Sequence, residues 1–163
     1  MIYLSLGSNL GNRMKYLLDA LHLISQDIGD ICECSQVYET EAWGKKDQPD
    51  FLNLAIGVKT RLNPVDLLES ILKIEVQLGR ERIVKWGERC IDIDILFYEN
   101  EIIALAPRLV VPHPLLIFRK FVLLPLVEIA PNYIHPQFKK SIQEILLTIE
   151  DESIITPIGN ISI

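Results

Sequence analysis

Four stretches of the chain have the apolar and polar patterning of β-strands, and two have that of amphipathic helices. The expected strands cover residues 2–6, 31–38, 51–60 and 91–98. The first helix should follow Asn12, a capping residue, and end at Gly29. The second should follow Asn63-Pro64, a cap with proline at the first helical position, and end at Gly79.

Residues 80–89 are charged and have no hydrophobic periodicity, which indicates a loop. A further strand is expected over residues 101–105. Frequent prolines after residue 106 predict only short helices there. Ser141 and Glu144 form a capping-box pattern that opens a last helix, and the residues after about 150 resemble a loosely attached tail. We expect one domain over residues 1–163.

The order β-α-β-β-α-β over the first 98 residues predicts a ferredoxin-like, split β-α-β sandwich of the α+β class. Its sheet should be rich in antiparallel pairs and carry two helices on one face. The opposite face should be free to hold a site.

Composition narrows the classes of function. The chain has 163 residues, of which 49% are hydrophobic, which is typical of a globular domain. Its net charge of −6 makes it a poor candidate for binding nucleic acid or an anionic membrane. No apolar run approaches 18 residues, so no membrane span is expected. Three cysteines cannot form a paired disulfide framework, and the N-terminus lacks a signal peptide. We therefore expect a cytoplasmic protein, of a size that suits a monomer.

Asp92 and Asp94 are the sharpest chemical feature. Side chains two apart in a strand lie on one face, about 6.5–7 Å apart along the chain. The opposite face of this strand would take Ile91, Ile93, Ile95 and Phe97. Adjacent carboxylates repel each other and become favourable around hard divalent cations, which predicts a metal site. A solvated strand face is the alternative for this pair alone.

A basic stretch immediately precedes the two aspartates. Arg80, Arg82, Lys85 and Arg89 lie within ten residues, and guanidinium groups match phosphate oxygens bidentately. Cations beside a metal site are what phosphoryl transfer requires, although a solvated loop with internal ion pairs would have the same composition. Since its four cations repel one another, we expect this stretch to be mobile in the free protein and to close when bound anions neutralise it, with Gly79 and Gly87 as hinges.

Two further patterns are compatible with ligand binding. Phe51 and Asn53 share a strand face, and an aromatic plate beside an amide can hold a flat, hydrogen-bonding heterocycle. His113 lies between two prolines that restrict its backbone. Either pattern alone would be ordinary structure.

Together these residues resemble the 6-hydroxymethyl-7,8-dihydropterin pyrophosphokinase family of folate synthesis, from about Leu4 to Pro131. The resemblance rests on five ordered motifs. These are Leu6-Gly7-Ser8-Asn9-Leu10-Gly11, Asp47-Gln48-Pro49-Asp50-Phe51-Leu52-Asn53, Gly79-Arg80-x-Arg82 with Trp86-Gly87-x-Arg89-x-Ile91-Asp92-Ile93-Asp94-Ile95, Val111-Pro112-His113-Pro114, and Arg119-x-Phe121-Val122-Leu123-x-Pro125-Leu126.

The resemblance implies a Mg²⁺-dependent transfer of diphosphate from ATP to the hydroxymethyl group of the pterin, with release of AMP. It implies that two Mg²⁺ ions bind to Asp92 and Asp94. The implied pterin-binding residues are Gly7, Thr40, Trp43, Phe51, Asn53, Asp92 and Phe121. The implied catalytic residues are Arg80, Arg82, Trp86 and Arg89. The implied ATP-binding residues are Glu75, Arg82, Arg89, Arg108, His113 and Arg119.

Glu41 and Glu88 stand where many members of the family have proline, and the stretch between Arg82 and Trp86 is one residue shorter than in some members. Two other functions remain open at this point. One is a binding module for pterin or nucleotide that has lost turnover. The other is a small domain that uses the aspartate pair only to bind Ca²⁺ or Mg²⁺ for stability.

Overall fold

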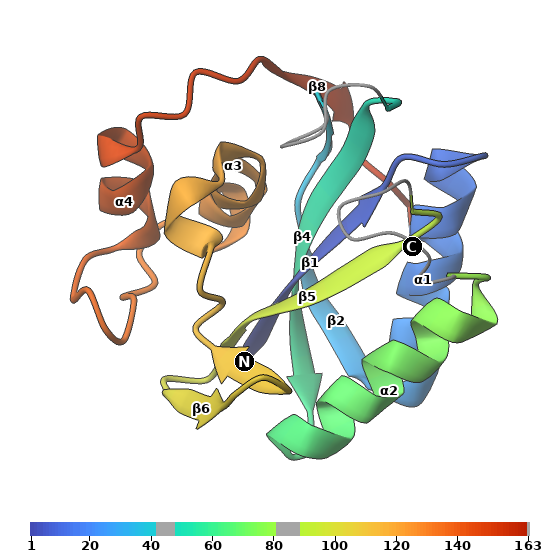
Figure 1. Ribbon diagram of the computed structural model, residues 1–163, viewed down its shortest axis with the longest axis horizontal. Helices are drawn as coiled ribbons and strands as arrows, with labels where there is room; N and C mark the ends of the chain where they lie inside the picture. Colours follow the sequence, from blue (N-terminus) through green and yellow to red (C-terminus); the bar gives the residue numbers. More distant parts are fainter. Residues whose placement is uncertain (42–47, 81–88, 163) are drawn as a thin grey trace.

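The computed structural model describes residues 1–41, 48–80 and 89–162 (Figure 1). In chain order the elements are β1 (Ile2–Ser8), α1 (Arg13–Asp27), β2 (Gly29–Cys34), β3 (Val37–Thr40), β4 (Phe51–Thr60), α2 (Pro64–Gln77), β5 (Asp92–Tyr98), β6 (Ile103–Leu105), β7 (Leu109–Val111), a 3₁₀ turn (Leu116–Phe118), α3 (Lys120–Ile129), α4 (Ile142–Thr148) and β8 (Ile155–Gly159). No helix among these residues is long and apolar enough to cross a bilayer.

One antiparallel sheet organises the fold. Its strand order is β5-β1-β4-β3-β8, and β2 also pairs with β4. Neighbouring central strands run antiparallel, with Leu4 opposite both Ile56 of β4 and Ile95 of β5. This order confirms the expected α+β, ferredoxin-like arrangement.

Helices α1 and α2 cover one face of the sheet (Figure 1). Each begins where its sequence signal predicts, because the side chains of Asn12 and Asn63 accept hydrogen bonds from first-turn N–H groups. The two helices bury an aliphatic stripe against alternate strand residues. That core includes Leu4, Leu6, Leu17, Leu21, Ile24, Leu54, Ile56, Ile71 and Ile74.

Helices α3 and α4 lie on the opposite face (Figure 1), so the expectation that this face is free is wrong for one half of it. Their side chains pack on a second core that contains Tyr3, Ala55, Phe97, Leu123 and Ile142. The capping box predicted at Ser141 is present, since Ser141 and Glu144 exchange hydrogen bonds at the start of α4. The remaining half of this face holds the candidate site.

Four local features differ from the sequence prediction. The strand expected over residues 31–38 is two strands, β2 and β3. They separate at Ser35, whose N–H donates to the Ala55 oxygen at 2.9 Å and whose hydroxyl accepts from the Ala55 N–H at 3.0 Å. The strand expected over residues 101–105 is shorter, Ile103–Leu105, and pairs with β7 in a separate two-stranded sheet.

The other two differences concern β5 and the C-terminus. The pairing of β1 with β5 shifts by one residue, so that Tyr3 faces Phe97 and Leu4 faces Ile95. This bulge moves Phe97 into the second core, instead of the α1/α2 face where strict alternation would place it. Beyond residue 150, where a loosely attached tail is expected, the structure has β8 paired with β3 along the edge of the sheet.

Candidate active site

A cavity of about 340 Å³ opens on the half of the sheet that α3 and α4 leave uncovered. Strands β1, β4 and β5 form its floor, because at this end they carry small, polar and acidic residues in place of large apolar ones. The cavity is lined by Ser5, Gly7, Thr40, Glu41, Gln48, Phe51, Asn53, Arg80, Arg89, Asp92, Asp94, His113, Leu115, Arg119 and Phe121.

The first wall is built from paired residues of β1, β4 and β3. Gly7 lies opposite Asn53, and a Cβ atom at Gly7 would approach the Asn53 Oδ1 to 2.9 Å. The Asn53 amide donates to the Thr40 hydroxyl at 2.7 Å, which fixes the orientation of the buried amide. Phe51 borders the same wall and is only half-buried. A glycine is required here because any larger residue would push the amide out of place.

The opposite wall comes from the start of α3 and the segment before it. Arg119 is buried and lies with its guanidinium carbon 5.7 Å from the centre of the Phe121 ring. His113 and Leu115 complete this side. Two aromatic rings, Phe51 and Phe121, therefore border one cavity from different elements.

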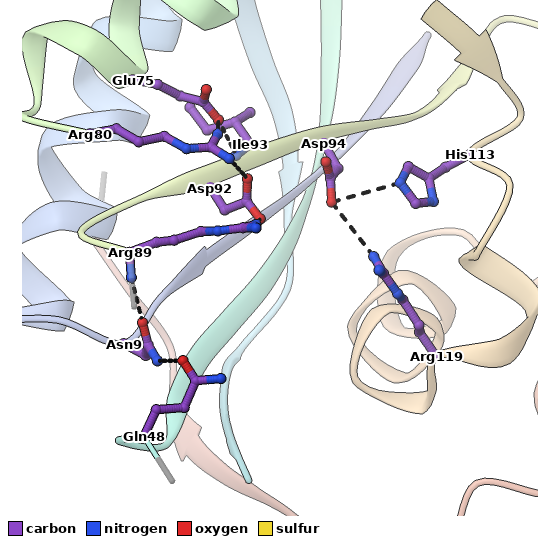
Figure 2. A network of polar contacts seen from close by, with 10 residues as sticks. All are labelled: Asn9, Gln48, Glu75, Arg80, Arg89, Asp92, Ile93, Asp94, His113 and Arg119. Carbon is purple, nitrogen blue, oxygen red and sulfur yellow. Dashed lines mark hydrogen bonds and ion pairs between the residues drawn. The ribbon is translucent and has the colours of Figure 1, made fainter. Parts of the chain in front are cut away.

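An ionic network links the floor to α2 (Figure 2). The Asp92 carboxylate accepts from Arg80 at 2.8 Å and also from Arg89. Glu75 accepts from Arg80 and, at 2.9 Å, from the backbone N–H of Ile93. Burial raises the pKa of Glu75, while the Arg80 charge acts in the opposite direction. Glu75 thus positions Arg80 from behind, without lining the cavity itself.

Asp94 has a different environment from Asp92. Its carboxylate lies 3.9 Å from both the His113 Nε2 and an Arg119 nitrogen (Figure 2). Burial raises the pKa of Asp94 to about 7, and the Asp92 charge adds to this. The side chain keeps 37% of its exposure, but it faces the cavity, so it is surrounded by protein on its other sides. A carboxylate whose ionised form is disfavoured in this way gains from a cation placed next to it.

His113 is held in one neutral form. Its Nδ1 accepts from the Leu115 N–H at 3.2 Å, which places the ring proton on Nε2, facing Asp94. Burial lowers the pKa of His113 to about 4, and the Arg119 charge lowers it further. At neutral pH the ring therefore offers an N–H donor and no charge.

The carboxylates can serve a hard divalent cation, although they cannot complete its coordination alone. Asp92 and Asp94 present oxygen atoms, the ligands that Mg²⁺ prefers. Over residues 1–41, 48–80 and 89–162, no three His, Cys, Asp or Glu side chains surround one point. The set therefore suits a cation that brings further oxygen ligands with it, as Mg²⁺ does when it carries phosphates and water.

Asn9 is a structural part of the site to which the sequence motif assigned no role. Its N–H donates to the Arg89 oxygen at 3.1 Å, and its Oδ1 accepts from the Arg89 N–H at 2.8 Å. Its amide nitrogen donates to the Gln48 side chain and the Pro49 oxygen, each at 3.1 Å. Asn9 thus joins the two chain segments that border the cavity (Figure 2).

The structure brings most of the expected site residues together. Those that line the cavity are Gly7, Thr40, Phe51, Asn53, Arg80, Arg89, Asp92, Asp94, His113, Arg119 and Phe121. Arg108 does not line it, and pairs instead with Glu69 at 2.5 Å on the surface. Trp43, Arg82, Lys85 and Trp86, and with them most of the expected closing loop, lie outside the described residues.

Four lining residues have no role in the sequence prediction, namely Ser5, Glu41, Gln48 and Leu115. The sequence pattern of β1 could have identified Ser5, because Ser5 alternates with apolar residues and shares a face with Gly7. Gln48 and Leu115 depend on contacts that no local pattern reveals.

The cavity combines the acidic, basic and aromatic side chains that a phosphotransfer enzyme needs to bind a metal, phosphate groups and a flat substrate. Residues 3–131 match the 7,8-dihydro-6-hydroxymethylpterin-pyrophosphokinase (HPPK) family, and the chain belongs to that family of folate-synthesis enzymes. The resemblance noted from the sequence motifs is thereby confirmed, as is the diphosphotransferase class.

Individual relatives agree with this assignment. A 2-amino-4-hydroxy-6-hydroxymethyldihydropteridine pyrophosphokinase of Aquifex aeolicus is 46% identical over 143 residues, 88% of each chain. One from Bacillus subtilis is 47% identical over 128 residues, 78% of this chain and 76% of that one. The folic acid synthesis protein fol1 of Pneumocystis carinii is 42% identical over 94% of this chain, which spans only 20% of its length.

Solved structures show the same fold. The HPPK-DHPS of Plasmodium falciparum superposes with a TM-score of 0.70 at 22% sequence identity. The match covers 90% of this chain and 43% of that one.

Proposed function

We propose that this cavity binds ATP and 6-hydroxymethyl-7,8-dihydropterin side by side and transfers the β,γ-diphosphate to the pterin hydroxyl. The observation that carries the proposal is the position of the carboxylate pair. Asp92 and Asp94 lie on the cavity floor. The floor meets the wall that carries Phe51 and Asn53 and also the wall that carries Arg119 and Phe121. Phosphate, metal and a flat heterocycle therefore have complementary surfaces within one space.

The pterin would lie between Phe51 and Phe121, with its polar edge toward Asn53. Aromatic rings on both sides of a flat heterocycle supply stacking, and a fixed amide supplies directional hydrogen bonds. Gly7 supports this placement because it leaves room for the Asn53 Oδ1 that a Cβ atom would displace. Thr40 holds the amide from behind, and the family resemblance assigns Trp43 to pterin binding as well.

ATP would lie on the cationic side. Arg119 and the His113 Nε2–H donor face Asp94, where phosphate oxygens would arrive. Arg80 and Arg89 both contact Asp92 and are within reach of the same region. We assign Arg82, Trp86 and Arg108 to nucleotide binding by family position alone, with Glu75 acting through Arg80.

Two Mg²⁺ ions would be held by Asp92 and Asp94. They would neutralise phosphate charge and polarise the group that is transferred. The fit is supported by the raised pKa of Asp94, whose ionised form requires a nearby cation to be favourable.

The chain's own residues act by orientation and charge. The pterin hydroxyl oxygen bonds to the β-phosphorus and its proton passes to water. The bond from that phosphorus to the α,β-bridging oxygen breaks, and AMP leaves with the bridging oxygen. No protein nucleophile is needed, because alignment of the hydroxyl with the β-phosphorus is sufficient. Arg80 and Arg89 pair with Asp92, and we assign to them the stabilisation of the charge that develops on the leaving oxygen.

The proposal is tested by incubating the protein with ATP, Mg²⁺ and the pterin alcohol and separating the products by chromatography. We expect AMP and pterin diphosphate in a one-to-one ratio. Stoichiometric ADP would contradict diphosphate transfer. Binding of both ligands without turnover would indicate a binding module, and binding of Mg²⁺ alone would indicate a structural metal domain.

A further inference from the structure

The segment after α4 contacts the start of α3 through the Asp151 carboxylate and the Ser153 backbone oxygen. Asp151 Oδ2 accepts from the backbone N–H of Lys120 at 3.0 Å, and its Oδ1 accepts from the Ser153 N–H at 2.9 Å. The Lys120 ammonium group donates to the Ser153 oxygen at 3.2 Å. Lys120 stands between Arg119 and Phe121, which both line the cavity. Asp151 therefore holds the turn that carries one wall of the site.

The same segment continues into β8, which pairs with the strand that borders the other wall. Ile155 lies opposite Thr40, and Gly159 lies opposite Val37. Thr40 lines the cavity and orients Asn53. Figure 1 shows the chain passing from α4 to this edge of the sheet. Residues 151–159, the C-terminal brace, thus touch the elements behind both aromatic walls.

A second contact fixes the far end of α3 to the start of β3. The Glu128 carboxylate accepts from the Gln36 N–H and the Tyr38 hydroxyl, each at 3.0 Å. Both ends of α3 are therefore linked to β3, the start through the C-terminal brace and the end through Glu128. Only the end held by Asp151 adjoins the cavity, which allows the positioning of the site to be separated from the general stability of α3.

Asp151 does what the helix's own capping residue does not. Arg119 occupies the N-cap position of α3 and makes no side-chain capping bond. Unpaired N–H groups at a helix start favour a carboxylate, both as a hydrogen-bond acceptor and as a charge against the helix dipole. Burial alone would raise the pKa of Asp151, but the hydrogen bonds from Ser153 and Lys120 more than offset this and lower it. The group is therefore an anion at neutral pH.

We propose that the C-terminal brace, through Asp151, sets the spacing of the two walls and is a positioning element for pterin binding. The inference rests on the proposed function, since it takes Phe51 and Phe121 as the two sides of the pterin site. It concerns a segment beyond residue 131, where the family match ends. Without the carboxylate, the first turn of α3 loses its acceptor and Phe121 loses its fixed distance from Phe51.

The test measures pterin binding by calorimetry in the presence of Mg²⁺ and a non-hydrolysable ATP analogue. Asp151→Ala should raise the Kd for pterin by about five- to twentyfold, part of what loss of a hydrogen bond to a charged group is worth. Asp151→Asn keeps one acceptor oxygen and should restore part of the affinity. Glu152→Ala removes the same charge from the neighbouring exposed residue and should leave the Kd unchanged.

Two further variants distinguish the possible failures. Glu128→Ala should lower the melting temperature and leave pterin affinity unchanged. Amide exchange in the first turn of α3 should accelerate in Asp151→Ala and not in Glu128→Ala. Phe121→Ala should weaken pterin binding strongly. If Phe121→Ala weakens binding and Asp151→Ala matches Glu152→Ala, the brace has no positioning role. If Phe121→Ala has no effect, the pterin placement is wrong and the inference falls with it. Equal losses of affinity in Asp151→Ala and Glu128→Ala would indicate a merely structural role.

Discussion

The two halves of one sheet face differ in residue size and polarity, although the same three strands build both. At one end β1, β4 and β5 contribute Tyr3, Ala55 and Phe97, which α3 and α4 bury in the second core. At the other end the strands contribute Gly7, Asn53 and Asp92, which line the cavity. The backbone pairing continues through both halves.

This difference shows that the residues along the strands create the site, because the backbone of the sheet is the same in both halves. The apolar half supplies stability, because its burial anchors the strands whose far ends carry the ligand-binding groups. The polar half is costly to the fold, since it holds two carboxylates close to each other and displaces the pKa of one. Each of the following predictions alters one half and asks whether the other half responds.

The largest effect is expected from Asp94→Asn in the polar half. Turnover should fall at least about 10²–10³-fold, because a charged group that serves the transferred phosphates is lost. The melting temperature should hold or rise, since a disfavoured carboxylate is removed. Single-turnover formation of AMP and thermal unfolding measure the two quantities. Asp19→Asn, which breaks a surface pair with Lys15, is the control, and near wild-type turnover in Asp94→Asn would reject the metal assignment.

The next effect compares two glycines on the same face. Gly7→Ala places a Cβ atom 2.9 Å from the Asn53 Oδ1, and we expect the Kd for pterin to rise about tenfold or more, as overpacking commonly costs about 1–3 kcal/mol. In the apolar half, a Cβ atom at Gly57 would meet the end of the Glu33 side chain at 2.7 Å, which can move aside. Gly57→Ala should therefore leave pterin affinity intact. Equal losses in the two variants would show that a general disturbance of packing, and not the displacement of Asn53, is responsible.

A change in the apolar half should affect stability alone. Phe97→Leu leaves space beside Tyr133, whose ring centre is 4.6 Å away, and should lower the free energy of unfolding by about 1–3 kcal/mol. Urea denaturation measures this loss. Turnover per folded molecule should stay close to wild type at a temperature where the variant is folded. A large loss of turnover would mean that the halves are mechanically coupled.

The smallest effect concerns pH and His135, which is buried against the apolar half. Its ring packs on Phe97 and Phe138, and its Nδ1 accepts from the N–H groups of Gln137 and Phe138. Lys139 and Lys140 are the charged neighbours along the chain, and both are exposed. Burial lowers the pKa of His135 in the folded state.

The unfolded chain takes up a proton near the ordinary histidine pKa of about 6.5, while the folded chain does so only at lower pH. Stability should therefore be complete above this value and decline as the pH falls below it. His135→Asn retains an acceptor in place of Nδ1 and should reduce the decline. Urea denaturation at a series of pH values measures the difference, and parallel curves for the two proteins would exclude His135 as the cause.

Local signals predict the elements that depend on local physics. β4 covers residues 51–60 as expected, because alternate apolar residues suffice to define a strand with one buried face. The starts of α1 and α2 follow from Asn12 and Asn63, whose side chains bond within the same turn. The shared face of Asp92 and Asp94 follows from strand geometry alone.

Features that depend on distant partners were not predictable in this way. The break at Ser35 arises from bonds to Ala55 in another strand, and the displacement of Phe97 from a register shift against β1. β8 exists because β3 offers it an edge. In the site, Asn9 joins two segments through Gln48 and Arg89, which lie 39 and 80 positions further along the chain. The roles of Trp43, Arg82 and Trp86 remain predictions from family position.

The contacts of Asn9 have a consequence for how such a chain can vary in evolution. Three of its hydrogen bonds engage main-chain groups, the N–H and oxygen of Arg89 and the oxygen of Pro49. Main-chain partners are present whatever side chains the flanking segments carry. Side-chain substitutions in the two flanking segments therefore leave these three hydrogen bonds available. Replacement of Asn9 would remove the two of these bonds that its side chain makes, so Asn9 tolerates less variation than the segments that it joins.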